Sequence, residues 1–371
     1  MAKFTSCFLL LILLSVSLSA QTQESDLRIF GYFQNSFAHE TEANTQKRHN
    51  SFNLQQLNLI AQKDLAENWR AFVNLKIINN FSTEKRWGAY SIEEAWLRYR
   101  YNNQFNLKLG LQIPIFNSFN EIKDRTPLVP YVVKPLVYED SYADIIPIED
   151  FVPRQAFLQV YGLYGKNKLK FEYAMYLGNS SNISTWSDEN ISGVDTSDTI
   201  MQGWRIGMRY ENLRAGISFT NDQVAGIKAL PNYFIEDSSI QDRVHRVRLG
   251  ADFSYEFANF DFKAEYITVF HDEKVEDLNL NKEFFYSTLG YYFDEQWYGY
   301  ISYWFDREKF LPFADISFEV FTTGASMRFT DRITFKAQYA YVKFNPHIYD
   351  PGFVYSTDDF NYYGLAASVY F

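Results

Sequence analysis

The sequence predicts an all-β fold, in which sixteen antiparallel strands form one transmembrane β-barrel with short periplasmic turns and long extracellular loops. Three features predict it: alternating connection lengths, apolar residues at every second position, and an aromatic carboxy-terminal strand. From Leu27 to Phe371, connections of two or three residues alternate with connections of roughly ten to forty residues. Barrels of the outer membrane have this asymmetry, because their two ends face different compartments. The short connections are 66–68, 102–104, 165–167, 211–212, 258–259, 294–296 and 330–332.

The strand segments alternate between apolar and polar residues with period two. Every odd position from 69 to 77 is apolar, whereas Arg70, Asn74 and Lys76 occupy even positions. Each segment has about 10 residues, and a tilted strand of about 9–11 residues crosses a bilayer core. Lipid cannot pair with backbone N–H and C=O groups, so a spanning sheet must close on itself. A soluble β-sandwich or adhesin would also alternate, but it does not explain the connection lengths.

The two ends of the chain predict export and assembly. A basic Lys3, an apolar run over 8–14 and small residues up to Ala20 predict a signal peptide over residues 1–20, which leaves 21–371 as a single barrel domain. The only cysteine, Cys7, lies in that peptide. The last segment is apolar at every second position up to Phe371 and resembles the signal that the barrel-assembly machinery recognises.

The composition fits an exported barrel in contact with outer-membrane lipid. Aromatic residues make up 19% of the chain, although the mean hydropathy is only −0.30. With 35 basic and 45 acidic residues, the net charge is −10. This balance argues against a nucleic-acid partner.

A sixteen-stranded barrel is wide enough to hold an aqueous channel. The longest connection, Ile115 to Arg154, is rich in proline and apolar residues, and we expect it to fold into the barrel as a constriction loop. A surface loop or a loop between subunits is the alternative. Its acidic residues outnumber its basic ones, and the candidates for the constriction are Glu121, Asp124, Glu139, Asp140 and Asp144.

The inward parity of the strands is predominantly basic, with fourteen Lys or Arg residues against seven acidic ones. The candidate channel-lining residues are Arg70, Lys76, Arg98, Arg100, Lys108, Arg205, Arg209, Arg246, Arg248 and Lys263, and the other four are Lys170, Arg214, Arg328 and Lys336. The seven acids are Glu94, Glu172, Glu211, Asp252, Asp261, Glu265 and Asp306. A basic wall favours anions. Alternatively, these arginines pair with neighbouring carboxylates for structural reasons.

The segments 92–101 and 105–116 resemble the phosphate-selective porin O/P family, with Gly110, Gln112, Pro114 and Phe116 at matching positions. The sequence departs from that family at 55–58, where arginines are expected. The resemblance implies a homotrimeric porin with anion sites. We therefore expect a water-filled channel for small hydrophilic solutes with an anion preference, and a channel specific for phosphate or another anion is the alternative.

Signatures of catalysis or metal binding are not found in the sequence. The five histidines have no metal-ligand spacing, and neither a nucleophile elbow nor a phosphate loop occurs. We expect no enzymatic activity, no cofactor and no metal. An adhesin or a hydrolase built on a barrel, with its catalytic residues at the rim, stays open because sequence spacing does not reveal such a site.

Overall fold

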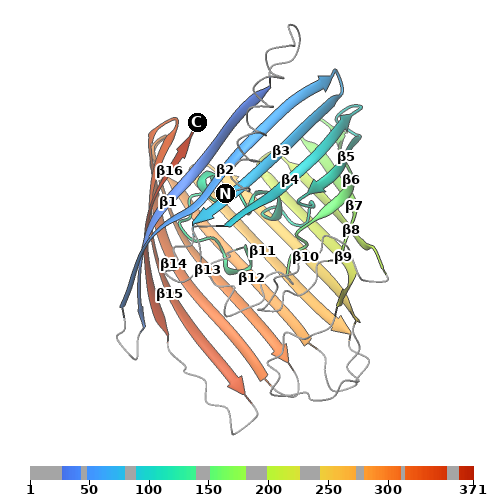
Figure 1. Ribbon diagram of the computed structural model, residues 1–371. Coiled ribbons are helices and arrows are strands. Elements are labelled where there is room, and N and C mark those ends of the chain that lie inside the picture. The colour runs from blue at the N-terminus through green and yellow to red at the C-terminus, as the bar shows by residue number, and fades with distance from the viewer. Residues whose placement is uncertain are drawn as a thin grey trace, which may run out of the picture.

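The computed structural model shows a closed barrel of sixteen antiparallel strands, in which β1 pairs with both β2 and β16 (Figure 1). The structure describes residues 27–42, 48–79, 89–138, 151–180, 199–225, 243–272, 280–310, 314–348 and 359–371. The predicted signal peptide, residues 1–20, lies outside them. The strands are β1 (Arg28–Glu42), β2 (Arg48–Ala66), β3 (Trp69–Asn79), β4 (Ala89–Arg100), β5 (Asn106–Gln112), β6 (Ala156–Lys166), β7 (Leu169–Gly178), β8 (Met201–Tyr210), β9 (Leu213–Ala225), β10 (Arg243–Phe257), β11 (Phe260–Asp272), β12 (Leu280–Tyr292), β13 (Trp297–Phe310), β14 (Ala314–Thr330), β15 (Ile333–Ile348) and β16 (Phe360–Tyr370).

The predicted number of strands and all seven short turns are confirmed. We call the end of the barrel that carries these turns the turn end, and the opposite end the loop end; they are at the top and bottom of Figure 1. Three connections at the loop end, 43–47, 273–279 and 311–313, are shorter than the predicted ten to forty residues. The reason is that strands such as β2 and β14, with 19 and 17 residues, are longer than the 9–11 or so that a bilayer requires.

The two faces of the barrel follow the predicted parity. On β3, Val73 and Leu75 are 38% and 42% exposed, whereas Asn74 and Lys76 are 3% and 6% exposed. The exposed face is the one that contacts lipid, where an uncompensated charge near the midplane costs about 2–4 kcal/mol. The polar side chains therefore point into the barrel.

The carboxy-terminal residue takes part in closing the barrel. The N–H of Phe371 donates to the carbonyl of Gly31 at 3.0 Å, and the N–H of Gly31 donates to the carbonyl of Phe371 at 2.9 Å. This reciprocal pair continues the β1–β16 ladder to the last residue of the chain. Within the described ranges, no helix is long and apolar enough to cross a membrane.

The connection between β5 and β6 enters the barrel. Its part over residues 113–138, here called the inner segment, carries three short 3-10 helices, η1 (Asn120–Ile122), η2 (Thr126–Leu128) and η3 (Leu136–Tyr138), and lies inside the ring of strands (Figure 1). With Phe151 and Val152 it packs against inward residues of β11–β16 in the largest apolar cluster of the described chain. The wall residues of this cluster are Ile267, Val269, Phe284, Tyr286, Tyr298, Tyr300, Trp304, Phe318, Val320, Ala340, Val342 and Tyr362.

Candidate pore and its charged wall

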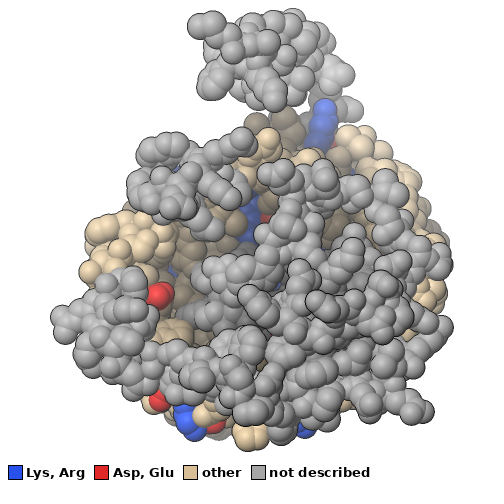
Figure 2. Space-filling view, turned by 60° about the horizontal axis from the view of Figure 1, so that its bottom comes forward, with Lys and Arg blue, Asp and Glu red and all other residues tan. Residues whose placement is uncertain are grey.

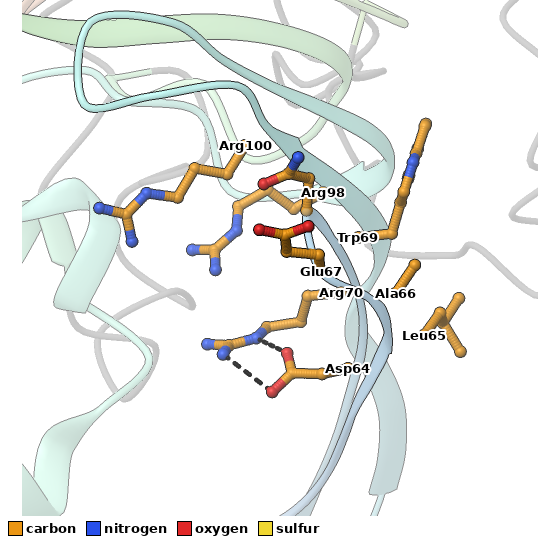
Figure 3. Close-up of a pocket in the computed structure, with 9 residues that line it drawn as sticks. Asp64, Leu65, Ala66, Glu67, Trp69, Arg70, Arg98 and Arg100 are labelled. Carbon is orange, nitrogen blue, oxygen red and sulfur yellow. Dashed lines mark hydrogen bonds and ion pairs between the residues drawn. The ribbon is translucent and has the colours of Figure 1, made fainter. Parts of the chain in front are cut away.

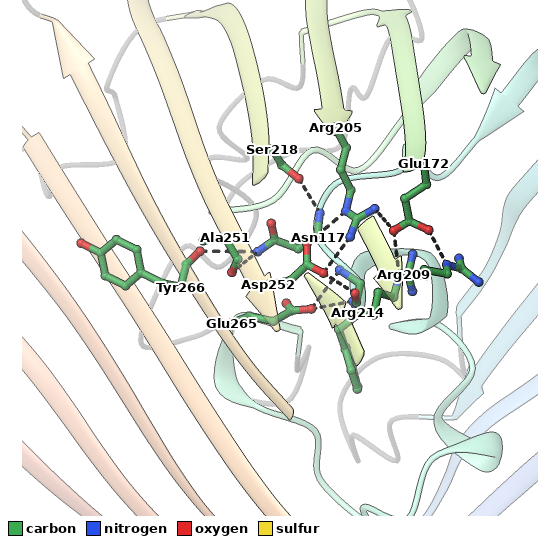
Figure 4. A network of polar contacts seen from close by, with 12 residues as sticks. Asn117, Glu172, Arg205, Arg209, Arg214, Ser218, Ala251, Asp252, Glu265 and Tyr266 are labelled. Carbon is green, nitrogen blue, oxygen red and sulfur yellow. Dashed lines mark hydrogen bonds and ion pairs between the residues drawn. The ribbon is translucent and has the colours of Figure 1, made fainter. Parts of the chain in front are cut away.

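Glu265 on β11 holds the start and the end of the inner segment. Its Oε1 accepts the backbone N–H groups of Ser118 and Phe119 at 3.0 and 2.7 Å, and its Oε2 accepts the hydroxyl of Tyr138 at 2.6 Å. Burial raises the pKa of Tyr138 well above its usual range, so this hydroxyl keeps its proton. At the residue before Ser118, the N–H of Asn117 donates to Ser218 Oγ on β9 at 2.9 Å (Figure 4).

Gln338 and Lys336 on β15 hold the middle of the inner segment. Gln338 Oε1 accepts the N–H groups of Val132 and Val133, both at 2.8 Å. Lys336 Nζ donates to the carbonyls of Thr126 and Pro127 at 2.9 and 3.2 Å. These are irregular backbone groups at membrane depth, which are tolerated only where protein or water satisfies them. The segment is therefore fastened to the wall along most of its length.

The predicted acidic residues of this connection have different surroundings. Asp124 is buried, and its carboxylate lies 3.4 Å from Lys76 Nζ on β3. Glu121 is partly exposed. Glu139, Asp140 and Asp144 lie outside the described residues. Asp124 is thus the one candidate among the described residues whose contact crosses from the inner segment to a predicted lining residue.

Four of the ten predicted lining residues are buried in ion pairs: Lys76, described above, and three arginines. Arg205 on β8 is 1% exposed, contacts Glu172, and makes a bidentate pair with Asp252 at 2.7 and 3.0 Å (Figure 4). Arg246 and Arg248 on β10 are 0% exposed, and both contact Asp222, at 2.5 and 3.2 Å. All three arginines are buried beside carboxylates of the wall, and Arg246 and Arg248 share that of Asp222, so their direct contact with a solute stays a prediction.

The other six of the ten predicted lining residues gather at the turn end, where they are accessible. Arg209 and Lys263 side chains are 47% and 40% exposed, although each has a carboxylate partner, Glu172 and Asp261, at 2.5 and 2.6 Å. Arg70, Arg98 and Lys108 are partly exposed and Arg100 is exposed. All six lie within four residues of the turn end of their strands.

Among the charged wall residues that the sequence analysis missed, Asp222 and Lys282 are buried. Asp222 on β9 is 2% exposed and contacts both Arg246 and Arg248, and Lys282 on β12 is 1% exposed and lies 2.9 Å from Glu308. Asp222 follows Ser218 and Thr220 at the inward parity of its strand, so extending the alternation to the strand end would have found it. Lys282 has the same parity as Phe284 and Tyr286, and a run of aromatic residues hid it.

The inner segment does not contact the wall evenly. Its apolar contacts lie on β11–β16, and most of its side-chain hydrogen bonds lie on β1, β2, β9–β12 and β15. The strands β4, β5 and β8 carry five of the predicted cations. In Figure 2 the loop end is turned toward the viewer, and Lys and Arg side chains, with an acidic one beside them, are visible deep in the hollow of the molecule.

A closed barrel that is apolar outside, charged inside and crossed by an inward-folded connection is an outer-membrane channel. The sequence matches the profile of the Gram-negative porins over residues 8–368, and the chain belongs to that family. Family and fold point to a channel rather than an enzyme, and they place the protein in the outer membrane. A search of curated protein sequences finds no relative.

Several solved outer-membrane proteins share the fold. The anion-selective porin from Comamonas acidovorans superposes with a TM-score of 0.64 at 11% identity, covering 94% of this chain and all of that one. A loop-deletion mutant of Vibrio cholerae OmpT gives 0.62 at 12% identity, with 94% and 100% coverage. Pseudomonas putida OprB gives 0.59 at 14% identity, with 93% and 94% coverage. At such identities the likeness shows the fold alone.

Proposed function

We propose that the protein is a porin for passive diffusion of small hydrophilic solutes, that residues 115–154 act as its constriction loop, and that it prefers anions. The observation that carries the preference is the position of the inner segment. Because this segment packs on β11–β16, the solute path runs along the opposite wall, where β4, β5 and β8 carry Arg98, Arg100, Lys108 and Arg209. Exposed positive charges next to the path attract anions and repel cations.

Planar-bilayer recording in a KCl gradient tests both parts of the proposal. The expected result is stable conductance with a reversal potential shifted from zero toward the equilibrium potential of chloride. A cation-selective reversal potential would refute the anion preference. Absence of conductance would refute diffusion through an open lumen and would favour the adhesin or hydrolase alternatives. Saturable block of the chloride current by phosphate would favour the narrower alternative, a channel specific for phosphate.

Assembly forms a second part of the proposal. The β16 strand, together with Phe371 that follows it, is the candidate signal for the barrel-assembly machinery, and removal of Phe371 is expected to lower the amount of folded barrel in the outer membrane. The homotrimer implied by the family resemblance is tested on unheated native gels after mild extraction. A band at the mass of one chain would contradict it.

A further inference from the structure

We propose that Arg98, together with Arg70 and Arg100, forms a binding subsite for the carboxylate group of an anionic solute at the turn end of the lumen. The proposal rests on the channel function above, because the lumen is the route by which solutes from the loop end reach this site. It adds a defined position and a chemical class of ligand. Four observations support it.

The first observation is a cavity beside the turn between β2 and β3. Its volume is about 410 Å³, and its charged lining consists of Asp64, Glu67, Arg70, Arg98 and Arg100 (Figure 3). Small-molecule sites in proteins usually have about 300–1,000 Å³, so a small organic anion fits. Three guanidinium groups against two carboxylates leave one uncompensated positive charge.

The second observation is a row of three cations across adjacent strands. Arg70 on β3 is the direct partner of Arg98 on β4, and Arg98 is the direct partner of Lys108 on β5. Like charges at directly opposite positions destabilise a sheet unless something compensates them. The outer two cations are compensated: Asp64 pairs with Arg70, and Lys108 Nζ lies 4.8 Å from the centre of the Trp96 ring.

The third observation concerns the cation in the middle of the row. Arg98 Nε is buried and has no hydrogen-bond partner among the described residues. Figure 3 shows the guanidinium groups of Arg70, Arg98 and Arg100 on the same side of the strands, facing the cavity. The positive charge of Arg98 is therefore not satisfied by an acceptor at Nε, and its guanidinium lines the cavity in which an anion would bind.

The fourth observation identifies the chemistry of the ligand. Beside Arg98, Arg70 holds the Asp64 carboxylate in a fork, with Nε to Oδ1 at 2.6 Å and Nη2 to Oδ2 at 3.2 Å. The site thus already accommodates one carboxylate on one guanidinium in the bidentate geometry that suits this pair. A solute carboxylate would take the same place on Arg98, and a second carboxylate on a short chain would reach Arg100.

Isothermal titration of the purified full-length barrel in detergent with succinate tests the subsite. We expect Arg98→Gln to weaken succinate binding about tenfold, which corresponds to about 1.4 kcal/mol. Arg98→Lys should lose part of the affinity, because an ammonium keeps the charge but not the fork. Asp64→Asn should strengthen binding by releasing the Arg70 fork, a gain that a defect in folding would not produce. Arg307→Gln, which removes an arginine paired with Asp315 on another part of the barrel, should leave binding unchanged.

Three results of the titration would overturn the proposal. Absence of succinate binding, or unchanged affinity in Arg98→Gln, would mean that this cavity is not a subsite. Binding of inorganic phosphate as tight as that of succinate would overturn the carboxylate preference. The titration requires no conductance, so succinate binding that depends on Arg98 in a barrel without anion-selective current would refute the proposed function and leave the subsite standing.

Discussion

The substitution Gln338→Leu tests how the inner segment is held, and it does so without changing any charge. Gln338 is 4% exposed, and its Oε1 is the acceptor for the N–H groups of Val132 and Val133, which are 0% and 4% exposed. Leucine has a similar size but accepts no hydrogen bond. Each buried donor left without an acceptor costs about 1–3 kcal/mol, so the two together cost about 2–6 kcal/mol of local stability.

Hydrogen exchange measured by mass spectrometry detects this loss of local stability. Opening of the segment at 132–133 becomes more favourable by the same free energy, so its amides should exchange at least about 30-fold faster, the factor that corresponds to 2 kcal/mol. Contacts made by Glu265 and Lys336 remain, so the rest of the segment should stay protected. In bilayers we expect more open-channel noise and an unchanged reversal potential, because the substitution is neutral.

Thr322→Val is the matched control. Thr322 Oγ1 accepts a hydrogen bond from Gln338 Nε2 at 3.1 Å but has no part in the pair of bonds to Val132 and Val133. In the Thr322→Val variant, the amides at 132–133 should exchange at a rate close to that in the unmodified protein. If Gln338→Leu exchanged at the same rate as the unmodified protein, the reasoning that these two bonds fasten the segment would be refuted.

Three further substitutions test the wall. Glu172→Gln removes the carboxylate shared by Arg205, Arg209 and Arg214, and should lower the free energy of unfolding in urea by about 3–5 kcal/mol; an unchanged urea midpoint would show that this network is dispensable. Arg209→Gln should move the reversal potential in a KCl gradient toward the cation side, because this side chain is accessible; no movement would place it away from the path. Val73→Lys puts a charge on the lipid face and should cost about 2–4 kcal/mol in unfolding experiments, and a fully stable variant would contradict the assignment of that face.

The fold was predictable because its main determinants repeat along the sequence. Three patterns can be recognised from neighbouring residues alone: alternation with period two, short turns at every second connection, and an apolar final strand. Together they determine the number of strands and which side chains face the lipid. Connection lengths were less predictable. A strand that continues beyond the membrane, as β2 does, keeps the same alternation, so the sequence does not mark where the bilayer ends.

The wall illustrates the limit of strand parity. Arg205 and Arg209 have the same parity on the same strand, four residues apart, yet one is 1% exposed and the other has a side chain that is 47% exposed. The difference arises from Asp252, which is 47 positions away in the sequence and reaches Arg205 only through the register of β8, β9 and β10. Parity predicts direction, whereas burial depends on partners that only the folded sheet brings together.

The same reasoning applies to the inner segment. Prolines and apolar residues predicted that it would pack against something, but its main polar partners, Glu265 and Gln338, lie at least 127 and 205 positions away from the groups they bind. In the sequence, neither residue differs from the other inward-facing positions of its strand. Their role became visible only when the register placed their side chains opposite buried N–H groups of the segment.

Selectivity depends on which charges a passing ion meets, and this is a smaller set than the charges counted on the wall. Arg205, Arg246 and Arg248 are buried beside carboxylates, with Arg246 and Arg248 sharing that of Asp222, so a passing ion feels a weakened field from them. Arg209 and Lys263 are accessible but share carboxylates. The least compensated positive charges lie on β4 at the turn end, at Arg98 and Arg100. An anion preference of this pore would therefore arise near its turn-end mouth, where exposed charges are screened over about 8 Å at physiological salt, and it should decline as the salt concentration rises.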